Sequence, residues 1–189
     1  MKSDYASGDI MSHILAALMY ENRLALLVSM QTGLRIDDVL HLKTADIKKD
    51  RFSIKEMKTG KRKYIRISKP LRDELFDQAG RFYVFEGRND PKKPRTRQAV
   101  YKDIKRAQTL FRVKNTQISP HTARKIYAVE MYRKYGNLKK VQELLNHSNE
   151  AVTLLYAMAD SITENKHTAG KRGQTPNGAR GSATDKQNI

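Results

Sequence analysis

The sequence of 189 residues contains no cysteine. This absence excludes disulfide bonds, a cysteine nucleophile and thiolate metal sites, so any covalent chemistry must use an oxygen or nitrogen atom. Long apolar runs are also missing, since none approaches the roughly 20 residues that a membrane-spanning helix requires. The N-terminal residues Met1–Tyr5 contain no basic region leading into a long apolar stretch. We therefore expect no secretory signal and a cytoplasmic location.

Acidic residues are scarce relative to basic ones. The chain has 20 Asp and Glu against 37 Lys and Arg, which gives a formal net charge of +17. Such an excess attracts polyanions, and nucleic acid is the commonest polyanion that a cytoplasmic protein meets. Ribosomal proteins, transcription factors and nucleases share this balance, so charge predicts the kind of partner and leaves the reaction open.

The spacing of apolar residues predicts a mostly helical chain, long enough for one domain with a buried core. Helical periodicity predicts two short helices between Ile10 and Met30, with Gly33 as their stop. Alternation predicts two strands at residues 51–56 and 63–67, joined by a turn at Thr59-Gly60-Lys61. Further helical stretches are expected at residues 37–40, 70–78, 100–107, 120–136, 138–145 and 151–158. The expected fold class is therefore mainly α with a small antiparallel β-sheet (α+β).

Two regions differ from the rest in composition. Residues 88–106 contain eight Lys or Arg against two Asp, which is typical either of a solvated surface or of a surface that grips phosphates. After about Thr163 the chain is rich in Gly, Thr, Asn, Gln and Lys. We expect residues 163–189 to form a flexible basic tail.

Four short segments carry residues suited to cutting DNA. In chain order they are Thr32–Leu40, Lys58–Lys61, Ser119–Arg124 and Leu144–Ser148, with Tyr156 nine residues after His147. In order and spacing these segments resemble the active-site boxes of the tyrosine recombinases, or phage integrases. The resemblance covers roughly residues 20–160, and it implies the catalytic-domain fold of that family.

The resemblance also implies a set of catalytic residues. Carried over position by position, they are Arg35, Lys58, His121, Arg124, His147 and Tyr156. Lys58 is preferred to Lys61 as the catalytic lysine of the hairpin. Two positions depart from the family pattern: Lys125 stands where a second histidine is often found, and Asn146 stands where glycine is usual. Neither position is a primary catalyst, but both bear on loop geometry and on support of the site.

The chemistry explains why these residue types occur together. Attack on a phosphodiester builds negative charge on two non-bridging oxygens, which the planar guanidiniums of Arg35 and Arg124 can bind bidentately. Tyr156 would be the nucleophile, helped by His121 as base and His147 as a further donor. Lys58 would protonate the departing 5′-oxygen. With this set no metal ion, cofactor or small-molecule substrate is needed, and the product is a 3′-phosphotyrosyl link that stores the bond for rejoining.

Taken singly, each of these residues has an ordinary structural role. His121 and His147 are suited to helix ends, Lys58 to a turn, and Tyr156 to a partly buried helix. The two arginines would ordinarily pair with acids at the surface. Their joint occurrence, in order, favours the catalytic interpretation.

The expected function is site-specific recombination of double-stranded DNA, for integration or excision, with self-association of the chain on DNA. Residues 1–162 are predicted to form the catalytic domain. The first box arrives at Arg35, which leaves no room for the N-terminal core-binding domain usual in the family, so that domain is expected to be absent. Two alternatives stay open: a DNA-binding relative without turnover, and relaxation of DNA like that of a type IB topoisomerase. The target site and the direction of recombination are not predicted.

Overall fold

A computed structural model describes residues 6, 8–114 and 116–146 of the chain. Its elements are α1 (Gly8–Ala17), α2 (Tyr20–Thr32), α3 (Ile36–Leu40), a 3-10 turn η1 (Asp46–Lys48), β1 (Arg51–Lys55), β2 (Arg62–Arg66), α4 (Lys69–Gln78), α5 (Arg97–Leu110), α6 (Pro120–Tyr135) and α7 (Leu138–Leu144). The expected helices and the hairpin are confirmed up to α7. The helix expected at residues 151–158 lies outside the described residues.

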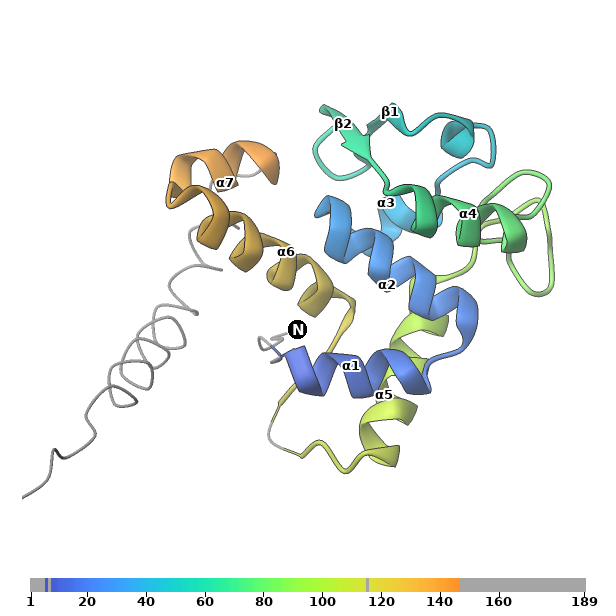
Figure 1. Cartoon of the computed structure of the whole chain (residues 1–189). Helices are drawn as coiled ribbons and strands as arrows, with labels where there is room; N and C mark the ends of the chain where they lie inside the picture. Colours follow the sequence, from blue (N-terminus) through green and yellow to red (C-terminus); the bar gives the residue numbers. More distant parts are fainter. Residues whose placement is uncertain (1–5, 7, 115, 147–189) are drawn as a thin grey trace, which may run out of the picture.

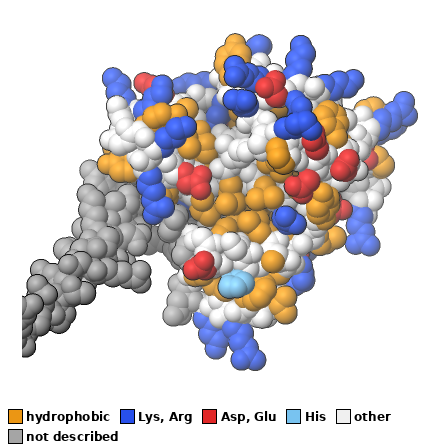
Figure 2. Space-filling view, in the orientation of Figure 1, with side chains coloured by type: hydrophobic (Ala, Val, Ile, Leu, Met, Phe, Trp, Pro, Cys, Tyr) orange, Lys and Arg blue, Asp and Glu red, His pale blue; other side chains and the backbone are white. Residues whose placement is uncertain are grey.

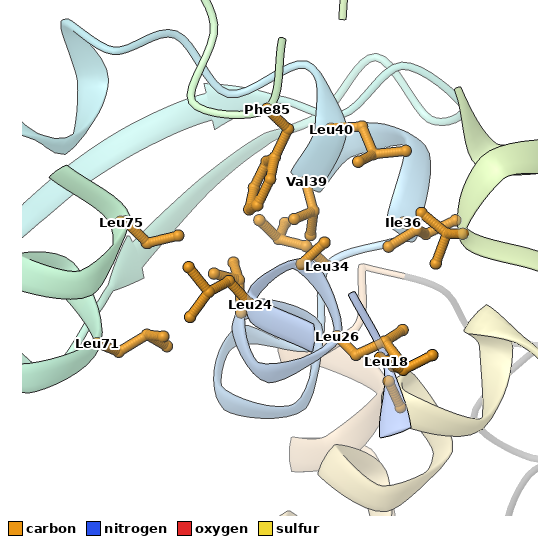
Figure 3. Close-up of a cluster of buried hydrophobic side chains, with 14 of the residues drawn as sticks. Leu18, Leu24, Leu26, Leu34, Ile36, Val39, Leu40, Leu71, Leu75 and Phe85 are labelled. Atoms are coloured by element: carbon orange, nitrogen blue, oxygen red, sulfur yellow. The ribbon is translucent and has the colours of Figure 1, made fainter. Parts of the chain in front are cut away.

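Helix α2 is the centre of the fold and packs against α1, α3, α4 and α6. Figure 1 shows it crossing the middle of the molecule, with α6 beside it and the hairpin above. Its Leu24 and Leu26 are fully buried, and Figure 3 shows them among side chains from α3, α4 and the segment that carries Phe85. Burying each such side chain contributes about 1.5–3 kcal/mol. This packing holds in place the helix ends that carry the polar candidate residues.

The two strands form an antiparallel hairpin in which Phe52 pairs with Ile65 and Ile54 pairs with Lys63. Successive side chains of a strand point to opposite faces, so Lys63 shares the inner face with Ile65. Both are buried, whereas Tyr64 between them is exposed. The hairpin therefore carries one lysine into the interior of the protein.

The end of α2 and the start of α6 are each set by local sequence. Gly33 caps α2 with a left-handed backbone (φ 67°), and a Cβ at this position would come within 2.4 Å of the Tyr127 ring on α6. Only glycine tolerates both the conformation and the close approach. At the start of α6, Ser119 and Thr122 form a capping box, and Pro120 lies between them in the first turn. Each cap thereby fixes the backbone next to it, which carries Arg35 after the end of α2 and His121 at the start of α6.

Basic side chains are spread over the surface of the fold. Figure 2 shows Lys and Arg around the rim of the face in view, with hydrophobic side chains gathered in its middle. Within the described residues, no helix is both long and apolar enough to cross a membrane.

Candidate active site

Four of the six candidate residues line one cavity of about 890 Å³. Arg35 comes from the start of α3, Lys58 from the turn of the hairpin, and His121 and Arg124 from the first turns of α6. Up to 89 positions separate these residues along the chain. Arg95, just before α5, and Arg97, its first residue, also line the cavity, so part of the basic stretch 88–106 faces it.

Arg35 lies at the junction between α2 and α3. It occupies the N-cap position of α3 in extended backbone (φ −69°, ψ 148°), directly after the turn that Gly33 makes possible. The side chain is buried, and its Nη1 lies 3.4 Å from Oε2 of Glu56. Arg35 is therefore a buried cation with a carboxylate beside it, and not the surface residue that an isolated arginine would suggest.

Arg124 joins three parts of the fold from its position on α6. Its residue exposure is 1%, its Nη1 donates to the carbonyl of Gly33 at 2.7 Å, and its Nη2 donates to the carbonyl of Leu145 at 2.8 Å. The same Nη1 lies 4.0 Å from Oε1 of Glu56. Because the end of α2, Glu56 of the hairpin and the end of α7 all meet this side chain, it connects the first and fourth sequence boxes with the hairpin that carries the second.

The hairpin turn presents Lys58 to the cavity and is anchored at its base. The backbone N–H of Met57 donates to Oδ1 of Asp38 at 2.8 Å, and the N–H of Gly60 donates to the carbonyl of Glu56 at 2.9 Å. Lys58 lines the cavity, whereas Lys61 does not. Burial raises the pKa of Asp38, although the hydrogen bond from Met57 and the nearby arginines oppose that rise.

His121 stands at the N-terminus of α6 with its side chain exposed to the cavity. Its backbone N–H donates to Oγ of Ser119 at 3.2 Å, as part of the cap. The cap fixes the backbone of the first turn, so His121 and Arg124, three positions apart, share one side of α6.

His147 and Tyr156, the remaining candidates, lie outside the described residues. Asn146, the last described residue of the chain, has left-handed backbone (φ 54°). This conformation explains the departure from the glycine usual at this position of the family pattern, because asparagine tolerates left-handed backbone better than other non-glycine residues.

Two residues of this site were missed in the sequence. Glu56 is fully buried between the two arginines, and Lys63 is 8% exposed, with no hydrogen-bond partner for its Nζ among the described residues. Burial and the nearby Arg124 lower the pKa of Lys63 from 10.5 to about 8. The sequence signal that could have found both residues is the alternation of side chains along the hairpin, since Glu56 is in phase with Ile54, and Lys63 with Ile65. We call Arg35, Asp38, Glu56, Lys63 and Arg124 the arginine centre.

The arginine centre is suited to an anion with several oxygens. Its three cations and two carboxylates are buried in the protein, where charge interactions are stronger than in water. No group of three or more His, Asp or Glu with the geometry of a metal site lies in the described part of the chain.

Comparison with known proteins identifies relatives of this chain. The model of the phage integrase family matches residues 7–161. The "Probable integrase/recombinase YoeC" of Bacillus subtilis (strain 168) is 29% identical over 139 residues, which cover 71% of this chain and 75% of that protein. A tyrosine recombinase of Thermosipho africanus (strain TCF52B) is 30% identical over 166 residues, which cover 81% of this chain and 56% of that protein.

A solved structure shows the same fold. A lambda integrase dimer bound to a COC′ core site superposes with a TM-score of 0.68 at 21% identity, covering 82% of this chain and 59% of the integrase chain. The chain thus spans little more than half the length of the Thermosipho relative and of this integrase. The expected fold, a recombinase catalytic domain, is confirmed.

Proposed function

This chain belongs to the phage integrase family, and from that premise we propose that it cuts and rejoins double-stranded DNA at specific sites as the catalytic part of a tyrosine recombinase. The observation that carries the proposal is the meeting of Arg35, Lys58, His121 and Arg124 around one cavity. An arrangement of this kind has little use as a structural core, because buried charge is costly unless it is paired.

The two arginines are proposed to bind the non-bridging oxygens of the phosphate under attack. Their guanidiniums are buried and held by fixed partners, so little reorganisation would be needed as negative charge develops. A preorganised donor of this kind typically contributes about 3–4 kcal/mol to the transition state.

Proton transfer is assigned to His121 and Lys58, the two candidates lining the cavity whose side chains are exposed. His121 would take the proton of the attacking hydroxyl, because an imidazole titrates near neutral pH. Lys58, on the turn of the hairpin, would protonate the 5′-oxygen as it leaves. Lys58 is assigned this role instead of Lys61 because only Lys58 lines the cavity.

Tyr156 is proposed as the nucleophile on the strength of its place in the family pattern, with His147 as an additional donor to the phosphate. The phenol oxygen would form a bond to phosphorus while the bond to the 5′-oxygen breaks, leaving a 3′-phosphotyrosyl ester and a free 5′-hydroxyl. Reversal with a second DNA strand would complete the exchange without ATP. The residues present require no metal ion or cofactor for this sequence of steps.

The wider arrangement follows from this proposal. We assign residues 1–162 to the catalytic unit and 163–189 to a C-terminal tail, and we propose that the protein works on DNA in the cytoplasm. The lambda integrase structure that it resembles is a dimer on DNA. This supports the proposal that copies of this chain associate when they bind their site.

The first prediction tests the covalent step. On a nicked suicide duplex, in buffer with EDTA, the wild-type chain should form an SDS-stable adduct, and Tyr156→Phe should form none while binding DNA with similar affinity. The reason is that only the nucleophilic oxygen is removed. Denaturing gels measure the adduct, and gel shifts measure binding.

Three results would contradict the assignment. An adduct that persists in Tyr156→Phe would exclude Tyr156 as the nucleophile. Binding without any adduct in the wild type would favour a DNA-binding relative without turnover. Relaxation of plasmids regardless of sequence would favour activity like that of a type IB topoisomerase.

A further inference from the structure

Glu56 approaches both arginines of the arginine centre. It is fully buried, with Oε2 3.4 Å from Nη1 of Arg35 and Oε1 4.0 Å from Nη1 of Arg124. Two guanidiniums in one buried place repel each other, and a carboxylate between them offsets that repulsion. Its position is therefore an electrostatic requirement for keeping the pair together.

The same residue forms the base of the hairpin turn. The Glu56 N–H donates to the carbonyl of Lys61 at 2.9 Å, and the hydroxyl of Thr59 donates to Oε2 of Glu56 at 2.8 Å. Lys58 lies inside this closed turn. Any movement of the Glu56 carboxylate would thus move the turn and the arginines relative to one another.

Lys63 lies on β2, opposite Ile54 of β1, and interacts electrostatically with both arginines and both carboxylates of the centre. Its Nζ is 5.7 Å from the centre of the Tyr127 ring. Arg124 and Arg35 favour its neutral form, whereas Glu56 and Asp38 favour its protonated form. Glu56 is thus one of two carboxylates that offset the repulsion between Lys63 and the two arginines.

We propose that Glu56 is a positioning residue, which holds the guanidiniums of Arg35 and Arg124 in fixed relation to the turn that carries Lys58. The inference rests on the proposed function for what the arginines bind, but the geometry of the centre can be tested without DNA. Neither Glu56 nor Lys63 belongs to the set of residues carried over from the family pattern.

A matched control exists elsewhere in the chain. Asp103 on α5 is also a buried carboxylate beside an arginine, with Oδ1 2.7 Å from Nη2 of Arg106. It does not line the cavity. Asp103→Asn therefore measures what the loss of a buried carboxylate does to the fold alone.

The experiment compares wild type, Glu56→Gln and Asp103→Asn in three measurements. Both variants should unfold at lower temperature. On the suicide duplex at saturating DNA, only Glu56→Gln should cleave more slowly, by roughly tenfold to a hundredfold, and Glu56→Asp should recover part of the rate.

The third measurement is made without DNA. In ¹⁵N-arginine spectra, the Nε–H signals of Arg35 and Arg124 should shift or broaden in Glu56→Gln and stay in place in Asp103→Asn. If Glu56→Gln does not fold, Thr59→Val removes one contact of the carboxylate and should give a smaller change in the same direction.

The outcomes separate the two proposals. A wild type that never cleaves would overturn the proposed function, and the arginine spectra would still decide the inference. Unchanged arginine signals in Glu56→Gln would overturn the inference. A rate equal to wild type, or a loss of rate no larger than in Asp103→Asn, would overturn it as well.

Discussion

Asp103 and Glu56 are both buried carboxylates beside arginines, yet their surroundings differ. Oδ2 of Asp103 accepts from the Met19 N–H at 2.8 Å and from Asn22 at 2.7 Å, and Oδ1 accepts from Arg106 at 2.9 and 2.7 Å. We call these residues the Asp103 network. In the arginine centre, by contrast, Glu56 lies 3.4 and 4.0 Å from its two arginines, beyond the best hydrogen-bond distances.

The difference also appears in polar atoms left without partners. Among the described residues, Oε1 of Glu56, Oδ2 of Asp38 and Nζ of Lys63 are buried with no hydrogen-bond partner, whereas both oxygens of Asp103 have partners. A saturated network stabilises one conformation of the fold. Incomplete pairing is costly in a protein interior, and each such buried group calls for a specific explanation, a catalytic role among them. The comparison therefore predicts that the two networks respond to mutation in different ways.

The largest expected difference is between the two arginines that pair with these carboxylates. Arg124→Ala should slow cleavage of the suicide duplex by at least about 100-fold, because it removes a transition-state donor. It should also lower the free energy of unfolding by about 3–5 kcal/mol, since Glu56 loses a buried partner. Arg106→Ala, at a half-exposed side chain, should cost about 1 kcal/mol or less and leave cleavage unchanged.

Single-turnover rates and thermal unfolding of both variants check this prediction, with rates taken well below each unfolding temperature. Arg124→Lys controls for charge, because lysine keeps the cation but loses the bidentate geometry. Equal losses of cleavage in Arg124→Ala and Arg106→Ala would break the comparison, since both networks would then act only through stability.

The hairpin turn provides the next prediction, at the edge of the arginine centre. Lys58→Ala should slow cleavage by about 100-fold, as loss of a general acid does, whereas Lys61→Ala should stay within about twofold of wild type. Neither should change stability by more than about 0.5 kcal/mol, because both side chains are exposed.

A modified substrate identifies the step that Lys58 serves. If the leaving 5′-oxygen is replaced by sulfur, the leaving group needs no proton, so Lys58→Ala should cleave that duplex at nearly the wild-type rate. Failure of the sulfur substrate to restore cleavage, or a larger defect in Lys61→Ala, would contradict the assignment of the general acid.

The fold, and the four candidate residues that meet at one cavity, could be predicted from the sequence for identifiable reasons. Apolar periodicity follows from the burial of one helix face, so the helices and the hairpin could be read from spacing. Gly33 and Pro120 mark a helix end and a helix start through their backbone preferences. The box pattern then located Arg35 and Arg124, whose meeting in one cavity is a property of the folded chain.

Glu56 and Lys63 could not be assigned in this way. Alternation places Lys63 in phase with Ile65, but lysine is seldom fully buried, so the pattern alone does not predict a buried ammonium group. Only the packing of α6 against the fold shows that Arg124 needs a buried carboxylate beside it. Charges that balance one another across distant elements leave no periodic trace in a sequence.

The smallest expected effect concerns two aspartates with opposite pKa shifts. Burial raises the pKa of Asp38 above its ordinary 3.8. Burial alone would also raise the pKa of Asp103, but hydrogen bonds from Asn22, Met19 and Arg106 together lower it below 3.8. The charged form of Asp103 is thus favoured by folding, and that of Asp38 is disfavoured.

These shifts predict pH dependences of opposite sign. The stabilising contribution of Asp103 is full above its unfolded pKa and is lost as pH falls through its lower folded pKa. The charged form of Asp38 costs stability above its raised folded pKa, and this cost disappears as pH falls through that value. Between pH 7 and pH 3, Asp103→Asn should therefore be least stable relative to wild type at pH 7, by a few degrees in Tm, and should approach wild type only in acid. Asp38→Asn should compare best with wild type at pH 7 and lose that relative advantage as pH falls. Thermal unfolding of the three proteins along this pH series measures both trends, and trends of the same sign would show that the two networks do not differ in the way that their hydrogen bonds indicate.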